Sequence, residues 1–273
     1  MSCFVAGLGV LAPGLSGRSN ALRVLRGDDA YGSQGGCVPQ FTGLAANEAR
    51  RCPTTARYAL DVGQQALEEA AWEAARVATI FSSGSGDLEI LDKNCRALIQ
   101  TPIALSPTLF HNSVHNAVAG YWGIAMGSRA STTSLSVFDD SFAGGLLEAL
   151  MMASLGTPAL LVAYDIPAPP ALALVRPIKE PFAVALALCL ERPAGACTRI
   201  DWAWEPRSTE GSVVDLPGLE TLRTTNPAAR SLPLLQAIAR LQATRIVLPY
   251  LAHGQLRLDV CPVSAVTPAD HRP

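Results

Sequence analysis

The chain has 273 residues, of which 49% are apolar and only 16% are charged, and its formal net charge is −2. This length suffices for one large α/β domain or two small ones. The sequence contains no Lys/Arg-rich stripe, which argues against a nucleic-acid partner. Typical soluble domains have about 25% charged residues, so we expect another chain to cover part of this surface.

The cysteines and the N-terminus indicate the compartment. The seven cysteines are scattered, and none forms a C-x-x-C pair, which predicts neither a zinc site nor a disulfide framework. Free thiols suit the reducing cytoplasm, and the start MSCFVAGLGV lacks the basic residues of a signal peptide. The longest apolar stretch, 149–175, is interrupted by Gly, Pro and Asp, so we predict a cytoplasmic protein without a membrane span.

Apolar strands and helices alternate along the first 204 residues, which predicts α/β layering with a mixed sheet. The run 3–9 is the first predicted strand. The first long helix, 54–75, has Thr54 or Thr55 as its cap. Further strands are predicted at 77–82, 131–137, 159–164 and 182–191, with 199–204 beside the last, and further helices at 87–100, 109–126 and 142–155.

The chain changes character after residue 204. Residues 205–230 are polar and rich in turn formers, and 232–242 is a predicted short amphipathic helix. Two β-rich runs flank Ala252-His253-Gly254 and predict a hairpin, and the tail 262–273, with three prolines, is predicted to fray. We therefore divide the chain into a main part, 1–204, and a helix plus hairpin, 205–273, packed on it in the same domain.

Two glycine-rich segments fit nucleotide-binding motifs poorly. Gly7-Leu8-Gly9 follows a strand, but Pro13-Gly14 would break the helix that a pyrophosphate site requires. The loop Ser82-Ser83-Gly84-Ser85-Gly86 lacks the G-K-[ST] of a phosphate-binding loop. Both segments are interpreted as turns, and we predict no cofactor.

The few histidines give no catalytic arrangement. His111 and His115 are four residues apart and would share one face of a helix. Such a pair could bind a metal, but the Glu of a zincin motif is missing, so we predict no metal site. The sequence offers no clear Ser–His–Asp or Cys–His set.

The segment around residues 138–141 is a predicted strand-to-helix turn, with Asp139 and Asp140 in exposed positions. Many acyl-transfer enzymes place a nucleophile at such a turn, where helix N–H groups can hold an oxyanion. Carboxylates also suit a helix N-terminus electrostatically, which is the simpler interpretation.

Several segments together resemble the N-terminal half of a β-ketoacyl-acyl-carrier-protein synthase of the thiolase-like fold. They are Phe4–Pro13 with its Gly-x-Gly-x-x-x-Pro turn, Ser106–Gly120 ending in Asn-x-x-Ala-Gly, Gly127–Ala130, Gly156–Ala163, and Arg176-Pro177 followed by 182–188. Their order and spacing cover residues 3–204. The resemblance implies a layered α/β half-fold lacking most of the C-terminal half of the family.

The departures from the family pattern imply that this chain is not an enzyme on its own. Counting without gaps from Asn116 forward and from Gly156 backward, the position of the nucleophilic Cys falls on Asp139 both times. A carboxylate cannot form the acyl thioester that condensation needs. Residues 205–273 show no match to the family's His-bearing motifs, so the resemblance implies a pseudoenzyme with no catalytic residue.

The block 111–130 most resembles the short chain-length factors of aryl polyene (xanthomonadin-type) biosynthesis, related to polyketide and fatty-acid synthesis. This implies a heterodimer with a full-length β-ketoacyl-ACP synthase, and only indirect contact with acyl carrier protein. The implied interface and acyl-tunnel residues are Leu109, Phe110, His111, His115, Asn116 and Phe138. Two other hypotheses remain open, a malonyl-ACP decarboxylase that uses the residual pocket and a self-associating scaffold.

Overall fold

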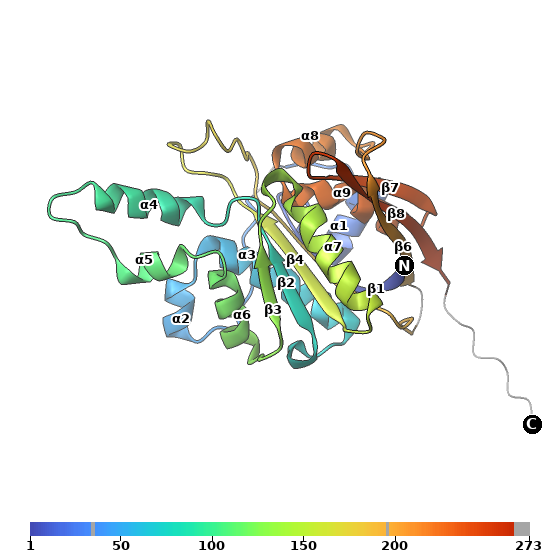
Figure 1. The fold of residues 1–273 in the computed structure, drawn as a ribbon, viewed down its shortest axis with the longest axis horizontal. Helices are drawn as coiled ribbons and strands as arrows, with labels where there is room; N and C mark the ends of the chain where they lie inside the picture. Colours follow the sequence, from blue (N-terminus) through green and yellow to red (C-terminus); the bar gives the residue numbers. More distant parts are fainter. Residues whose placement is uncertain (34–35, 195–196, 265–273) are drawn as a thin grey trace, which may run out of the picture.

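A single mixed sheet of eight strands organises the protein. The computed structural model describes residues 1–33, 36–194 and 197–264. The strand order is β3-β2-β4-β5-β1-β6-β8-β7 (Figure 1). The strands are β1 (Ser2–Leu11), β2 (Ala78–Ser82), β3 (Thr132–Leu135), β4 (Ala159–Asp165), β5 (Phe182–Cys189), β6 (Cys197–Pro206), β7 (Thr244–Tyr250) and β8 (Gly254–Val263).

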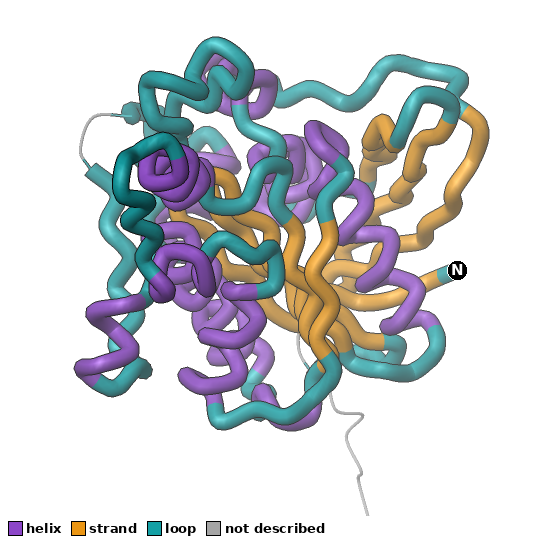
Figure 2. Tube along the Cα trace, turned by 60° about the vertical axis from the view of Figure 1, so that its left-hand side comes forward, coloured by secondary structure: helices purple, strands orange, loops and turns teal. Residues whose placement is uncertain are grey.

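Helices cover both faces of this sheet (Figure 2). The α-helices of the described chain are α1 (Arg18–Arg26), α2 (Ala46–Arg51), α3 (Thr54–Ala70), α4 (Leu88–Leu98), α5 (Pro107–Asn112), α6 (Ala117–Met126), α7 (Ser141–Ser154), α8 (Pro217–Thr225) and α9 (Leu232–Arg240). Three short 3₁₀ turns accompany them: η1 (Ala74–Arg76), η2 (Phe138–Asp140) and η3 (Ala228–Ser231).

The sheet separates two hydrophobic cores. Successive strand residues point to opposite faces. Leu161 of β4 therefore belongs to the core that also contains side chains of α1, α7, α8 and α9, whereas its neighbour Leu160 belongs to the core that contains side chains of α3 and α6. Strands β4 and β5 are buried along almost their whole length. Their nearly continuous apolar sequences follow from this burial on both faces.

The strand pairing corrects one prediction. β2 runs parallel to β3 and β4, and the other pairs are antiparallel. The run 199–204 was expected beside 182–191, but β1 lies between β5 and β6 and pairs with both. The predicted hairpin is confirmed, because β7 and β8 pair antiparallel around residues 251–253.

Gly7 and Gly9 lie inside β1 rather than at a turn. A Cβ atom added to Gly7 would lie 2.0 Å from the carbonyl oxygen of Ala66, and one added to Gly9 would lie 2.0 Å from that of Val62. These glycines therefore let α3 lie directly on β1. No helix follows them at once, since β1 continues to Leu11, which removes the basis for a dinucleotide site.

Several predicted boundaries also need correction. Helix α3 ends at Ala70, because Ala71 adopts a left-handed conformation (φ 55°), and neither Thr54 nor Thr55 caps it. The polar stretch 205–230 contains helix α8, which its turn-rich composition concealed. The predicted frayed tail begins within β8, which reaches Val263, and its remainder from residue 265 lies outside the described residues.

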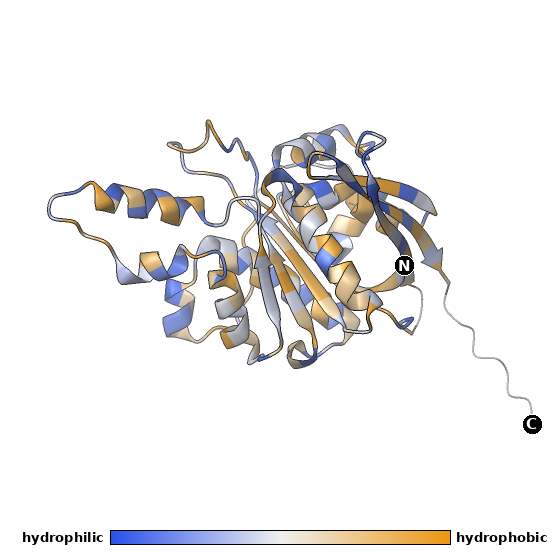
Figure 3. Ribbon diagram, in the orientation of Figure 1, coloured by the Kyte–Doolittle hydropathy of each residue, from blue (hydrophilic) through white to orange (hydrophobic). Residues whose placement is uncertain are grey.

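Helices α4 and α5 project from the body as an arm (Figure 1). Asp87 caps α4 by accepting a hydrogen bond from the backbone of Ile90 at 2.9 Å. Apolar residues occur along both helices of this arm (Figure 3), and Leu91, Leu98 and Phe110 among them are exposed. Over the described residues, no helix has the length and apolar character to cross a bilayer.

Candidate functional site: the turn between β3 and α7

The candidate site is the turn that leads from β3 at the sheet edge into α7. Phe138 has φ 52°, a left-handed conformation that is rare for a bulky residue. The Ser141 hydroxyl donates to the Phe138 carbonyl at 2.7 Å and accepts from the Val137 N–H at 2.9 Å. These two bonds hold the turn in its tight form.

Both carboxylates of the turn form ion pairs with guanidinium groups. Asp139 lies 2.7 Å from Nη1 of Arg176 and 3.4 Å from Nη2 of Arg230. Asp140 lies 2.6 Å from Nη1 of Arg230 and accepts the N–H of Leu251, in the β7–β8 turn, at 2.9 Å. The two negative charges thus face two positive ones, and the contacts of Asp140 tie the turn to the C-terminal hairpin.

Arg176 connects this turn to the glycine-rich loop after β2. Its side chain is almost buried; Nε donates to the Ser85 hydroxyl at 2.7 Å, and the guanidinium lies 4.1 Å from the centre of the Phe138 ring. The remaining nitrogen, Nη2, is buried without a hydrogen-bond partner among the described residues. The loop predicted to be a simple turn is therefore a junction between β2, the arm and Arg176.

Asp165, at the end of β4, holds the same loop from the other side. Its Oδ1 accepts from the Ser83 hydroxyl at 3.0 Å and from the Gly84 N–H at 2.9 Å. Complete burial raises the pKa of Asp165 to about 7, although these hydrogen bonds and the charge of Arg176 act in the opposite direction. Asn226 donates to the Asp165 carbonyl at 3.0 Å and thereby joins the C-terminal segment to this point.

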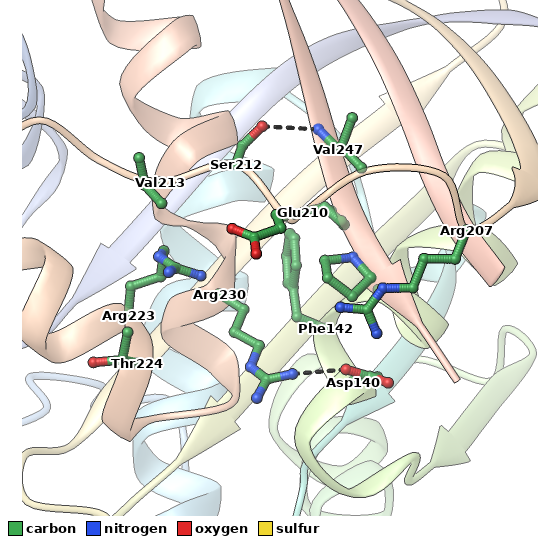
Figure 4. A pocket seen from close by; sticks show the side chains of 14 residues that line it. Asp140, Phe142, Arg207, Glu210, Ser212, Val213, Arg223, Thr224, Arg230 and Val247 are labelled. Carbon is green, nitrogen blue, oxygen red and sulfur yellow. Dashed lines mark hydrogen bonds and ion pairs between the residues drawn. The ribbon is translucent and has the colours of Figure 1, made fainter. Parts of the chain in front are cut away.

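Two hollows adjoin the turn. The larger encloses about 480 Å³ between the start of α7, the 207–213 segment and β7, and Figure 4 shows its charged side chains. The smaller encloses about 290 Å³ and shares Arg230 and Thr224 with it. Arg223 and Arg230 in their walls are paired with Glu220 and Asp140. No group of His, Cys, Asp and Glu in the described chain is arranged to hold a metal ion.

The structure distributes the predicted tunnel residues over two places. Leu109 is half-buried on α5 and Phe110 is exposed there, whereas Asn116 lies just before α6. His111 and His115 do not share a helix face, because α5 ends at Asn112. His111 lines a separate hollow of about 480 Å³ between α2, α5 and α6.

One contact links these two places. Nε2 of His115 lies 2.8 Å from the carbonyl oxygen of Leu135, at the end of β3. Phe138 follows three residues later. The segment 109–116 and the turn are thus joined through β3.

Sequence reasoning missed the residues that hold the turn, namely Arg176, Arg230 and Asp165. Arg176 was noted only as part of a segment that resembles the family. Arg230 lies in a stretch that was interpreted as irregular, so it was not singled out. Each of them lies far along the chain from Asp139. A signal for Asp165 was present, because a carboxylate directly after the buried run 159–164 needs hydrogen-bond partners.

Comparison with known sequences assigns the family. Residues 30–246 match the pattern of the β-ketoacyl synthase N-terminal domain. The chain belongs to the β-ketoacyl synthase family. A stretch of 99 residues is 30% identical to 3-oxoacyl-[acyl-carrier-protein] synthase 2 of Vibrio cholerae. This match covers 34% of the present chain and 24% of the length of the Vibrio protein.

Solved structures of the family share the fold. A chain from the ketosynthase ApeO in complex with its chain length factor ApeC, from Xenorhabdus doucetiae, superposes with a TM-score of 0.71 at 24% identity, covering 95% of this chain and 99% of that one. A chain of the ishigamide ketosynthase/chain length factor gives 0.68 at 12% identity, covering 97% and 100%. The predicted thiolase-like, mixed α/β half-fold is thereby confirmed.

Proposed function

We propose that this β-ketoacyl synthase family member is a non-catalytic subunit like a chain length factor. It pairs with an active, full-length β-ketoacyl-ACP synthase and forms part of the wall of that enzyme's acyl tunnel. The proposal rests on the ion pairs formed by the two carboxylates of the β3–α7 turn. Its carboxylates are bound by Arg176 and Arg230, and we take Asp139 to occupy the position of the family's nucleophile.

An ion-paired carboxylate is a poor starting point for covalent catalysis. Nucleophilic catalysis needs a group with an adjacent base that activates it, whereas Asp139 faces two cations. In this proposal the partner supplies the catalytic residues. The ion pairs hold the vestigial turn in its tight conformation and fix its position relative to the C-terminal hairpin.

The exposed surface supports a partner on the β3 side of the molecule. β3 is an edge strand of the described sheet, and an open edge is a surface on which another chain can pair. Exposed apolar side chains accumulate in the neighbouring stretch of chain: Leu91, Leu98, Ile99, Ile103, Phe110, Val114 and Ile124. Exposed apolar side chains in this number are typical of an interaction surface.

Two similar structures contain a ketosynthase together with a chain length factor, which supports a ketosynthase as the partner. We extend the proposal to aryl polyene or related polyketide synthesis in the cytoplasm, with acyl carrier protein docking chiefly on the partner. None of the seven cysteines is placed in a disulfide, an arrangement that is consistent with that compartment.

Co-expression with a full-length ketosynthase from the same gene neighbourhood tests the pairing. We expect a tag on this chain to retain the ketosynthase, and native mass spectrometry to give a one-to-one complex. Ile124→Asp should abolish that complex, because a charge would be buried at the contact. Leu155→Asp, at an exposed apolar position at the end of α7, is the matched control and should assemble normally.

Two results would contradict the proposal. A stable homodimer that ignores the ketosynthase would indicate a scaffold. Release of carbon dioxide from malonyl-ACP by this chain alone would indicate a decarboxylase.

A further inference from the structure

The smaller hollow beside the turn has a wall with more positive than negative side chains. It encloses about 290 Å³ between the turn, the segment 175–179 and the end of α8. Among the described residues that line it, Arg176, Lys179 and Arg230 face the single carboxylate of Asp139. The chain as a whole has a formal net charge of −2, so this accumulation of cations is a local feature.

The larger hollow next to it is electrically balanced. Three arginines and three carboxylates of the described chain lie in its wall or pair with it: Arg207, Arg223, Arg230, Asp140, Glu210 and Glu220. Arg223 forms its ion pair with Glu220, and Arg230 reaches Asp140 (Figure 4). The excess of positive charge therefore belongs to the smaller hollow.

Lys179 is the cation that has no counterion there. Its side chain is exposed in the wall of the smaller hollow, and no described residue forms an ion pair or a hydrogen bond with its ammonium group. The chain contains one other lysine, Lys93 of α4, which is paired with Glu89 at 2.6 Å. An ammonium group has three donors and no acceptor, so Lys179 is free to bind an anion.

The neighbouring arginines also have donors to spare. Nη2 of Arg230 lies 3.4 Å from Asp139, whereas the shorter contacts of the turn, to Arg176 and to Asp140, measure 2.7 and 2.6 Å. Nη2 of Arg176 is buried with no hydrogen-bond partner among the described residues. On this side of the turn, charged donors therefore outnumber the acceptors that the described chain supplies.

Apolar walls strengthen the field of these cations. The lining also includes Phe138, Val175, Ile178 and Pro227. A cleft with apolar walls and an excess of one charge focuses the electric field and concentrates counterions. Ammonium and guanidinium groups bind carboxylate and phosphate oxygens through strong, charge-assisted hydrogen bonds.

We propose that the smaller hollow binds the anionic group, a carboxylate or a phosphate, of a small ligand, with Lys179 and Arg230 as its charged donors. Over the two hollows together, the described cations exceed the carboxylates by one, so one bound anionic charge completes the balance. Asp139 contributes by holding Arg176 in place. The site belongs to this chain alone and does not depend on the proposed pairing with a ketosynthase.

Selective labelling of the two lysines tests this site in the full chain. The lysines are acetylated with N-hydroxysuccinimide acetate at constant pH and ionic strength, with inorganic phosphate or malonate added, and peptide mass spectrometry follows Lys179 and Lys93 separately. We expect half-maximal protection of Lys179 at an anion concentration on the order of 1 mM, and acetylation about tenfold slower at ten times that concentration. Lys93 is the internal control, since Glu89 already pairs with it, and its rate should not change.

Lys179→Gln gives a second measurement, at an exposed position where the substitution leaves the core intact. The temperature of thermal unfolding should rise with the concentration of the protecting anion, because a ligand of the folded state stabilises that state. This rise should disappear in Lys179→Gln and persist in Lys93→Gln, the matched control. Protection by phosphate alone would assign a phosphorylated ligand, and protection by malonate alone a carboxylate. Equal slowing of both lysines, or no slowing with either anion, would overturn the inference.

Discussion

Asp165 shows how a single buried residue can set the response of the protein to pH. It closes β4 with its carboxylate enclosed by Ser83, Gly84 and the nearby Arg176. Burial raises its pKa from 3.8 to about 7, so the folded protein binds the proton more tightly than the unfolded chain does. The stabilisation from that proton is complete below about pH 4 and is lost as the pH rises to about 7.

We predict that this one group makes the free energy of unfolding fall between pH 4 and pH 7. The two pKa values correspond to a loss on the order of 4 kcal/mol. Asp165→Asn keeps an oxygen that can accept both hydrogen bonds but cannot ionise, so it should remove this slope. Urea unfolding of the unaltered chain and of Asp165→Asn at several pH values measures the difference between their free energies of unfolding. The contributions of all other titrating groups cancel in that difference.

The control for this prediction is Asp215→Asn. Asp215 is an exposed carboxylate whose pKa is lowered by hydrogen bonds from Arg240, so its loss should destabilise the protein at neutral pH more than in acid. A profile for Asp165→Asn parallel to that of the unaltered chain would refute the role of Asp165.

At the scale of elements, the packing of β1 on α3 depends on two glycines. Gly9 lies against the carbonyl of Val62, with only 2.0 Å available for an added Cβ. We predict that Gly9→Ala lowers the free energy of unfolding by about 3 kcal/mol or more, because the helix must move away from the strand. Gly120→Ala, in α6 with open space around it, should instead be neutral or stabilise by roughly 0.5–1 kcal/mol. Thermal unfolding of the two variants and of the unaltered chain measures both changes in stability.

The elements that bury apolar runs could be predicted from the sequence, and those defined by long-range contacts could not. Strands β2, β4 and β5 follow directly from runs such as 159–164. The position of β1 between β5 and β6 depends on pairing across more than 170 residues, which no local pattern encodes. Helix α8 was missed because its sequence is polar and its stability comes from Leu219 and Leu222 in the core.

The same distinction applies to the candidate site. The strand–turn–helix around Asp139 was predictable, since the local pattern changes from strand to helix there. Arg176 and Arg230 reach it from 37 and 90 residues away, so their pairing with the turn had no signature in the sequence. The pairing of these charges is therefore a result of the fold.

At the scale of the whole molecule, both halves of the chain contribute to one sheet and share its cores. β6 pairs with β1 on one side and with β8 on the other, and Gln236 of α9 donates to the carbonyl of Leu25 in α1. The core that contains α7 includes side chains of β1 and of β8. We therefore infer that residues 205–264 cannot unfold without exposing apolar surface of the preceding part.

This architecture predicts one cooperative unfolding transition, which two tryptophans can report separately. Trp122 is buried with Phe81 in the core beneath α3, and Trp202 lies in the opposite core, where it donates to the Ser154 hydroxyl at 3.1 Å. In variants that retain only Trp122 or only Trp202, we expect the urea transitions followed by fluorescence to coincide in midpoint and slope. An earlier transition at Trp202 alone would show that the C-terminal helices and hairpin form a separate unit, and that the chain divides into two domains near residue 204.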